Sequence, residues 1–371
     1  MREDRKRNSN PMCHNQGQKK VLFVNVTHTD YPRHKQLANA FRDKGFAVEV
    51  IQRPEGVGYF ARCVKLLASA FQHKKYSTVV LAEFAISYAW VSWIIAKLSR
   101  SAHIVDGFIG MHETHVEDTQ KVRPGSFKGI AYRWLDWLAF VSADYYLIDT
   151  HARRKALLDS YGYLSRSKSV IVLPVGAPDW ASPQAMPMSD EMQILYYGNY
   201  IPLHGVSQFI EALALLDPRT PWHATFIGPK KKSTEHERLA EKLGLAEKID
   251  FMDSVRENEL IGYIREHHVV VGIFGDSNKA RSVIANKVWQ GLAAGRVVLT
   301  RNTQGISEIA STFPGSLLLT DSDTPSDIAV VLDQISTLDF HAMPLEESKR
   351  LVDAYTKHHY DEFLSIFDGA A

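Results

Sequence analysis

Short apolar runs alternate with helix-like segments along most of the chain, and this alternation constrains the fold more than any other feature. The first half contains "VLFVNV", "FAVEVI", "STVVLAE", "HIVDGF", "DYYLID" and "SVIVLPV", and the second contains "QILYYGN", "WHATFIG", "KIDFMDS", "VVVGIFG", "RVVLT" and "SLLLT". Most of these runs lead into a segment with helical periodicity, such as 31–44, which Gly45 ends. The alternation predicts parallel sheets with helices on both faces.

The series is interrupted once, by "GAPDWASPQAMPMSDE" at 176–191, which holds three prolines and no periodicity. We therefore predict an α/β protein with two doubly wound, Rossmann-like domains facing a cleft and a hinge near 176–191. The expected parts are a disordered basic N-terminus (1–20), an N-terminal Rossmann-like domain (21–178), a C-terminal Rossmann-like domain (190–345) and a helix (346–371) that packs back across the domain boundary.

Charge is divided unevenly along the 371 residues, although the net charge is only +1. Residues 1–180 hold 26 Lys and Arg against 16 Asp and Glu, and the remainder holds 17 against 26. A basic half without a recognised nucleic-acid module favours contact with an anionic membrane surface or another anionic lipid, and no nucleic acid.

The location of the protein is indicated by its cysteines and apolar runs. Cys13 and Cys63 form no CxxC pair, and no apolar run reaches the roughly 18 residues of a membrane span. We expect a cytoplasmic protein, peripheral at most on the inner membrane face.

Glycines and polar residues follow the first strand of the second half, in "YYGNYIPLHG". Gly198 permits close approach of a ligand to the backbone, and Gly205 precedes a helix whose free N–H groups attract phosphate. Asn199 and His204 add polar side chains. The motif indicates a phosphate site, although an ordinary strand–helix turn would also explain it.

A second polar stretch, "IFGDSNKARSVIANKVWQGLAAGRVVLT", follows another strand of the same domain. Lys279 and Arg281 lie in a predicted loop, and Asn286 and Lys287 open the next helix. Two such strand ends together predict a diphosphate site. The alternative is that the loop charges are simply solvated.

These stretches resemble the retaining GT-B glycosyltransferases of family 4. The resemblance rests on "GNYIPLHGVSQFIEAL", "FIGPKK", "DFMDSVRENEL", "NKVWQGLAAGRVVLTRNTQGISEI" and the closing helix. In the first half, "IVDGFIGMHETHVEDT" and "LDWLAFVSADYYLIDT" are similar to bacterial members that assemble surface polysaccharides. The resemblance implies that the donor binds mainly in the C-terminal domain.

Carried over to this sequence, the donor site comprises His28, Thr29, Gly198, Asn199, His204, Gly205, Gly228, Lys279, Arg281, Asn286, Lys287 and Gln290. Family members with a Glu-x7-Glu motif bind ribose hydroxyls through its second acid. This chain has Ser282 and Gln290 at the two positions, so the charge-assisted bond is missing.

The first half is expected to supply the acceptor site. Asp106 ends a predicted strand and is expected to face the cleft, and His112 and Glu113 follow it. These three are the candidates for acceptor contact or catalytic positioning. A helix-cap or turn role explains Asp106 equally well.

Two further motifs suggest metal sites but have simpler explanations. In "DSD" at 321–323, Thr324 is placed to cap a helix that begins with Pro325. In "HETH", His112 and His115 have no third ligand at a recognisable spacing, which favours surface or acceptor-loop residues. We therefore expect no metal and no cofactor other than the nucleotide-sugar substrate.

The resulting hypothesis is a retaining glycosyltransferase of the hexosyltransferase type. It would move a sugar from a nucleotide-sugar donor to a glycan or lipid-linked acceptor, in surface polysaccharide or glycolipid synthesis. The alternatives are a nucleotide-sugar binding protein or scaffold that has lost catalysis, for which Ser282 and Gln290 argue, and an epimerase on the same fold.

Overall fold

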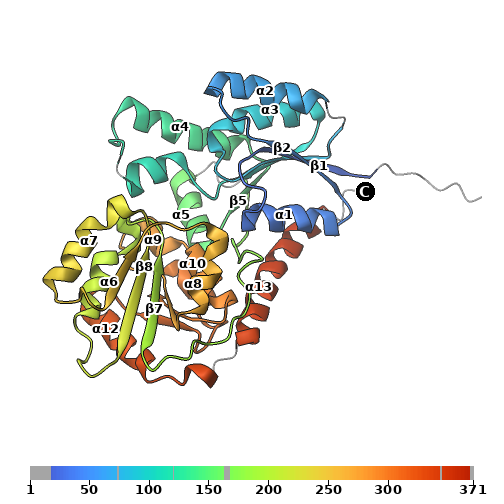
Figure 1. The fold of residues 1–371 in the computed structure, drawn as a ribbon. Helices are drawn as coiled ribbons and strands as arrows, with labels where there is room; N and C mark the ends of the chain where they lie inside the picture. Colours follow the sequence, from blue (N-terminus) through green and yellow to red (C-terminus); the bar gives the residue numbers. More distant parts are fainter. Residues whose placement is uncertain (1–17, 73–74, 120, 163–167, 343–344, 368–371) are drawn as a thin grey trace, which may run out of the picture.

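The computed structural model describes residues 18–72, 75–119, 121–162, 168–342 and 345–367. These residues form two α/β domains, each built on a sheet of six parallel strands with helices on both faces (Figure 1). The architecture confirms the predicted fold class. The strand orders are β2-β1-β3-β4-β5-β6 and β12-β11-β10-β7-β8-β9. Each sheet is built first on one side of its first strand and then on the other. The topological switch point therefore lies between β1 and β3 in one sheet and between β7 and β10 in the other.

The N-terminal domain forms because its apolar runs are buried on both faces of the sheet. Its strands are β1 (Lys20–Val26), β2 (Ala47–Gln52), β3 (Thr78–Leu81), β4 (Ala102–Asp106), β5 (Tyr145–Ile148) and β6 (Ser169–Val172). Its helices are α1 (Pro32–Asp43), α2 (Tyr59–Gln72), α3 (Ala89–Ser99), α4 (Phe127–Ser142) and α5 (His151–Tyr161), with short turns η1 (Ile86–Tyr88) and η2 (Glu113–Asp118). One face of the sheet packs against α1, and the other against α2, α3 and α4.

The C-terminal domain repeats this plan. Its strands are β7 (Met192–Tyr197), β8 (Trp222–Ile227), β9 (Ile249–Met252), β10 (Val269–Val271), β11 (Val297–Arg301) and β12 (Leu317–Thr320). Its helices are α6 (Val206–Leu213), α7 (Lys230–Lys242), α8 (Leu260–Arg265), α9 (Asn278–Ser282), α10 (Asn286–Ala293), α11 (Gln304–Ala310) and α12 (Pro325–Ser336), with turns η4 (Pro202–His204), η5 (Glu257–Glu259) and η6 (Phe340–Ala342).

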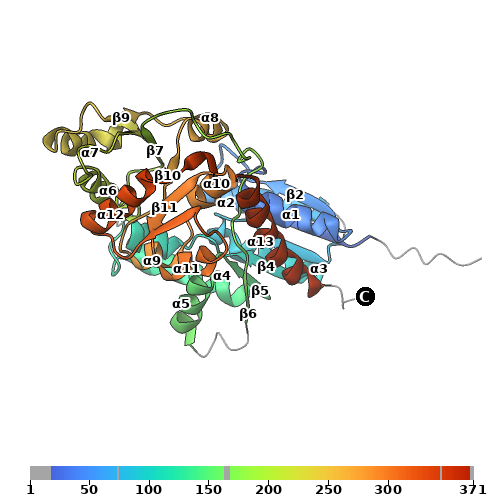
Figure 2. The same cartoon turned by 90° about the horizontal axis from the view of Figure 1, so that it is seen from below.

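The closing helix α13 (Leu345–Ser365) lies against both domains (Figure 2). Val352 packs in the core of the C-terminal domain, whereas Tyr360 and Phe363 pack in the core of the N-terminal domain. The Tyr360 hydroxyl donates to the Pro174 carbonyl at 3.1 Å. One helix thus contributes apolar side chains to two cores.

The proline-rich segment 176–191 contains no helix or strand up to β7, yet much of it is fixed to the C-terminal domain. The buried guanidinium of Arg296 donates to the carbonyls of Gln184 and Ala185 at 2.9 and 2.8 Å, and Ala181 is buried in the core. The segment is therefore packed along much of its length. Its first residue, Gly176, is also buried, and a Cβ there would lie 2.5 Å from Gln36 Nε2 and 3.0 Å from Thr356 Oγ1.

The expected basic N-terminus lies mostly outside the described residues, which begin at 18. Its last residue belongs to the fold: Lys20 starts β1, and its ammonium pairs with Glu49 at 2.9 Å. None of the helices in the described part of the chain combines the length and the apolar character that a membrane span requires.

Candidate functional site

Glycines follow two neighbouring strands near the switch point of the C-terminal sheet. Gly198 follows β7 with φ +140°, and a Cβ there would lie 3.0 Å from the His204 ring and 3.4 Å from Lys287 Nζ. Gly228 follows β8, and a Cβ there would lie 2.4 Å from the Gly198 carbonyl. Gly205 has φ +61° and lies against Phe274. A larger residue at Gly198 would therefore enter the space beside His204 and Lys287, where such sheets bind ligands, whereas Gly228 is required by its close packing on the Gly198 carbonyl and the Tyr200 ring.

Lys287, in the first turn of α10, places a buried cation beside this backbone. The residue is 5% exposed, and its Nζ has no hydrogen-bond partner among the described residues. Its nearest aromatic neighbour is the Tyr196 ring, 4.2 Å from Nζ to the centroid. Burial lowers the pKa of Lys287 to about 7. An ammonium held without a counter-ion is a binding group for an anion.

His204 lies next to Lys287 and is held by Tyr196. The Tyr196 hydroxyl donates to the Asn199 carbonyl at 2.9 Å, so at His204 Nδ1, 2.7 Å away, it accepts. Burial first, and then the Lys287 charge, lower the pKa of His204 well below its ordinary value. A neutral ring with Nδ1 protonated leaves Nε2 available for a ligand.

Gln290, on the same helix α10, contacts two polar side chains from other elements. Its Oε1 accepts from the Tyr197 hydroxyl at 2.9 Å, and its Nε2 lies 3.5 Å from a carboxylate oxygen of Glu257 in η5. The sequence argument noted the loss of an acid at position 290. The structure shows that Glu257, from another element, brings a carboxylate next to that position.

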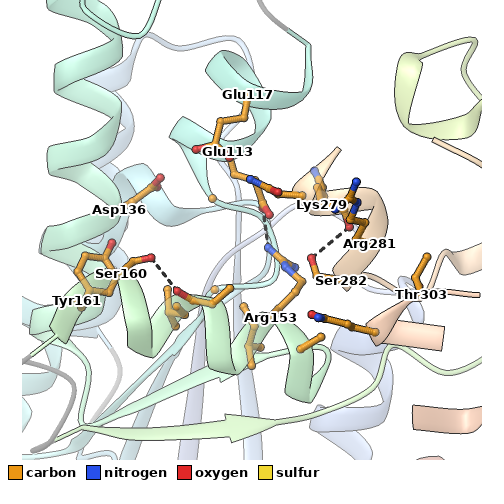
Figure 3. A pocket seen from close by; sticks show the side chains of 18 of the residues that line it. Glu113, Glu117, Asp136, Arg153, Ser160, Tyr161, Lys279, Arg281, Ser282 and Thr303 are labelled. Carbon is orange, nitrogen blue, oxygen red and sulfur yellow. Dashed lines mark hydrogen bonds and ion pairs between the residues drawn. The ribbon is translucent and has the colours of Figure 1, made fainter. Parts of the chain in front are cut away.

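A cavity of about 810 Å³ lies between the domains (Figure 3). The N-terminal domain lines it with η2, α4 and α5, and the C-terminal domain lines it with α9 and the residues after β11. Its polar lining residues include Glu113, Glu117, Asp136, Arg153, Ser160, Lys279, Arg281, Ser282, Asn302 and Thr303. A mixed set of acids, amides, hydroxyls and cations suits a polyhydroxylated ligand.

Arg153 organises the acidic side of this cavity. Its guanidinium is buried and pairs with Glu113 at 2.6 Å and with Asp149 at 2.7 Å. Asp136 accepts from the amides of Met111 and His112, both at 2.8 Å. Burial outweighs these bonds and raises the pKa of Asp136 to about 6. Glu113 thus lies in the cavity, whereas His112 contributes its backbone to Asp136 and pairs its ring with Glu117.

The predicted grouping of Lys279 and Arg281 with Lys287 is not what the structure shows. The two residues lie in the short helix α9, capped by Ser277, and they line the interdomain cavity, whereas Lys287 is not part of that lining. Arg281 is half-exposed and binds Asp276 in a bidentate ion pair. Because its charge is already neutralised, Arg281 is a weaker anion ligand than the sequence suggested.

Several contacts join the two domains beside these groups. Asn286, at the start of α10, donates to the Tyr31 hydroxyl at 3.2 Å. The Glu308 carboxylate accepts from the amides of His151 and Ala152, at the N-terminus of α5, at 2.9 and 2.8 Å. His28 and Thr29 lie in the exposed turn after β1. The turn reaches the domain interface through Tyr31.

Asp106 differs from its predicted role, because it does not face an open cleft. It ends β4 as expected, but its carboxylate is 2% exposed and pairs with Arg33 Nε at 2.7 Å. It also accepts from the Phe108 amide at 3.1 Å, which is the turn role considered as the alternative. An isolated guanidinium at Arg33 would be costly to bury, so Asp106 serves as its counter-ion.

The two discounted metal motifs have structural partners. Thr324 caps α12 by accepting from the Asp327 amide, and Pro325 occupies the first turn, as predicted. His115 lies against the Tyr132 ring. Within the described ranges, no cluster of three or more His, Cys, Asp or Glu side chains is arranged to hold a metal ion.

Sequence reasoning missed Arg153, Asp136 and Glu257. Arg153 had a recognisable signal, because it sits one turn after Asp149 and Thr150 at the end of the strand run "DYYLID". Polar residues in that place face the ligand edge of a parallel sheet. Asp136 and Glu257 had none: each lies on a helical segment where an acid normally faces solvent.

Comparison with known proteins gives one family match and a consistent set of structural neighbours. Residues 191–337 match the family described as glycosyl transferases group 1. HepE of Anabaena, whose structure holds UDP and glucose, is 14% identical with a TM-score of 0.68, covering 95% of this chain and 100% of its own. No curated protein matches.

Two further neighbours have other activities. Sucrose-phosphate synthase of Thermosynechococcus elongatus is 12% identical, with a TM-score of 0.67 and coverage of 95% and 98%. A Listeria monocytogenes protein described as a UDP-N-acetylglucosamine 2-epimerase is 12% identical, with a TM-score of 0.58 and coverage of 95% and 97%. These similarities extend over almost the whole chain and concern the fold. The chain therefore has the two-domain GT-B fold, and residues 191–337 of it match the family of glycosyl transferases group 1.

Proposed function

We propose that the protein is a retaining glycosyltransferase whose nucleotide-sugar donor places its diphosphate against Lys287, His204 and the backbone at Gly198. The observation that carries this proposal is the unpartnered, buried ammonium of Lys287 at the switch point of a glycosyl transferase group 1 domain. A diphosphate supplies the counter-ion that the described residues do not. The HepE complex with UDP is in accord with such a donor.

The acceptor, in this proposal, occupies the interdomain cavity. Both domains line this cavity, so an acceptor bound there would contact both of them. Glu113, held by Arg153, and Asp136 accept hydrogen bonds from the hydroxyl groups of a glycan. Glu113 is therefore the candidate for positioning the acceptor. His112 contributes its backbone amide to Asp136, and Asp106 is the buried counter-ion of Arg33.

The reaction needs little from the protein besides positioning and charge. The bond between the anomeric carbon and the donor phosphate oxygen breaks, and the acceptor oxygen forms its bond on the same face of the sugar. The acceptor proton passes to the departing phosphate oxygen. Lys287 and the amides at the start of α10 stabilise the charge that develops on the diphosphate.

The test is a donor panel of UDP-, GDP- and ADP-sugars, with and without glycan and lipid-linked acceptors. Acceptor-dependent release of nucleoside diphosphate, with the anomeric configuration of the product kept, is the expected result, and Lys287→Met should abolish it. A changed sugar without release of diphosphate identifies an epimerase instead. Tight nucleotide binding without turnover of any donor identifies a binding protein or scaffold.

A further inference from the structure

The outer surfaces of α2, α3 and α4 carry exposed apolar side chains, which we call the α2–α4 face. Phe127 is 90% exposed, Phe60 81% and Trp134 61%. The other members are Tyr59, Val64, Phe71, Trp93, Leu98 and Ile130. These three helices cover one face of the N-terminal sheet, and Figure 1 shows α2 and α3 on the side of that domain remote from the C-terminal domain.

The exposed side chains follow helical periodicity. Phe60, Val64 and Phe71 have the i, i+4, i+11 spacing that puts them on one side of α2. Phe127, Ile130 and Trp134 have the i, i+3, i+7 spacing that does the same for α4. The opposite sides of these helices are buried against the sheet. Each helix is thus apolar toward the core and again toward the outside, which folding of the monomer does not require.

The charges on these helices have almost one sign. α2, α3 and α4 carry the basic residues Arg62, Lys65, Lys97, Lys128 and Arg133. Their acidic content is Asp136 alone, which lines the interdomain cavity and accepts hydrogen bonds from backbone amides there. Aromatic side chains among basic ones are the composition of a surface that inserts between anionic lipid headgroups.

The exposed apolar residues of the C-terminal domain do not have this pattern. Leu215 and Val330 are each 56% exposed, on a domain whose sequence carries a net negative charge. Scattered residues of this kind are ordinary on a protein surface. They make a matched control, because their exposure is close to that of Trp134 and Ile130.

We propose that the α2–α4 face docks on an anionic lipid bilayer. The sequence assigned this contact to the basic half as a whole, whereas the structure places Trp134 and Trp93 at the surface, in a face that includes no residue before 18. Because α4 borders both the face and the cavity, docking brings the cavity close to the lipid surface (Figure 3). The acceptor would then be lipid-linked, a consequence that rests on the proposed function, whereas docking itself does not.

The test is co-flotation of the full chain with phosphatidylcholine vesicles that contain increasing fractions of phosphatidylglycerol, without donor. Binding should rise with the anionic fraction and fall with salt. Phe127→Ser with Trp134→Ser should lower the partition coefficient about tenfold or more, because transfer of one aromatic side chain from water is worth roughly that factor. Lys128→Glu with Arg133→Glu should lower it several-fold for each charge, at low salt only.

The controls are Leu215→Ser with Val330→Ser, and Lys231→Glu with Lys232→Glu on α7, neither of which should change binding. Deletion of residues 1–17 should leave most of the binding intact. Equal melting temperatures exclude unfolding as the cause of a loss. No flotation at low salt, equal losses in the controls, or loss on deletion of 1–17 would overturn the proposal. So would face variants that change only the oligomeric mass, which would indicate a second protein chain as the occupant. Vesicle binding that persists in a protein without transferase activity would refute the proposed function alone.

Discussion

Replacing Lys287 by Met should make the ligand-free protein more stable. Burial lowers the pKa of Lys287 to about 7, against about 10.4 for an ordinary lysine. At about 1.4 kcal/mol per pKa unit, the charged residue destabilises the fold by up to about 5 kcal/mol. Methionine has a similar shape and no charge, so Lys287→Met should recover a large part of this energy, as expected where a residue is kept for function.

The gain depends on pH in a defined direction. Below about pH 7 the lysine is charged in both the folded and the unfolded chain, and the full cost is present. Between about pH 7 and 10.4 the unfolded chain holds more protons on this residue than the folded one, so wild-type stability rises with pH. Urea unfolding of both proteins should therefore show the largest difference at pH 6 and a small difference near pH 10.

The same residue should couple diphosphate binding to proton uptake. A bound diphosphate restores the counter-ion and raises the lysine pKa again. At pH 8 the free site is mostly neutral, so binding should take up about 0.9 protons, and at pH 6 only about 0.1. Calorimetry of the tightest-binding nucleoside diphosphate, in buffers of different ionisation enthalpy, measures this number directly.

The matched control is Lys248→Met, because Lys248 also lies over an aromatic ring, with Nζ 4.9 Å from the Trp222 centroid. Lys248→Met should change the free energy of unfolding by no more than about 0.5 kcal/mol, and it should leave the proton uptake on diphosphate binding unchanged. Lys287→Met should bind the diphosphate roughly 10- to 150-fold more weakly, the loss of one charge-assisted bond. A less stable Lys287→Met protein at pH 6, or wild-type binding at pH 8 without proton uptake, would refute the reasoning.

Three other predictions concern the remaining charged groups. Glu257→Gln should reduce the preference for a ribonucleoside diphosphate over its deoxyribose analogues in competition binding, because Glu257 provides the carboxylate beside Gln290; an unchanged preference would exclude Glu257 from ribose contact. Burial, and then the Asp106 charge, raise the pKa of Glu83 to about 8, so wild-type stability should fall as pH rises from about 4.3 to 8, and Glu83→Gln should flatten that part of the unfolding curve; an unchanged slope counts against it. Transfer should survive EDTA, because Lys287 and the helix amides take the place of a cation; restoration of a lost activity by Mg²⁺ or Mn²⁺ would contradict this.

The fold was largely predictable because its signals are local. Each predicted strand run in the described chain corresponds to a strand, and residues such as Val79 and Leu195 are fully buried, as apolar runs between helices require. The order of the strands was not predictable. β10 pairs with β7 and β11, not with β9, which precedes it in the chain. That order depends on how helices pack across both faces, which no local pattern encodes.

The surroundings of the candidate residues were predictable where the backbone position of a residue decides them, and not where its ion-pair partner does. Gly198 and Lys287 could be found because they stand at a strand end and a helix start. Asp106 also stands at a strand end, but Arg33, from the first helix, removes it from the cleft. Arg281 is diverted by Asp276 in the same way. Ion pairing, with a distant residue for Asp106 and with a residue five positions away for Arg281, therefore limits what spacing alone reveals.

Both sheets hold unpartnered polar groups at the point where their strand order reverses. In the C-terminal sheet the group is Lys287. In the N-terminal sheet, Asn25 has φ +63°, and neither of its side-chain polar atoms has a hydrogen-bond partner in the described chain. Glu83 Oε1 is also buried without a hydrogen-bond partner among the described residues. Buried groups of this kind destabilise a fold unless a ligand or water completes their bonds.

The start of α10 connects these two places. Lys287 provides the cation for the diphosphate, and its neighbour Asn286 donates to Tyr31, which precedes the helix that carries Arg33. Two adjacent residues thus serve the donor in one domain and the contact with the other. A diphosphate that draws Lys287 toward Gly198 acts on the same helical turn that holds Tyr31. In the proposed function, a diphosphate at Lys287 would therefore act on the helical turn that also makes a contact with the other domain.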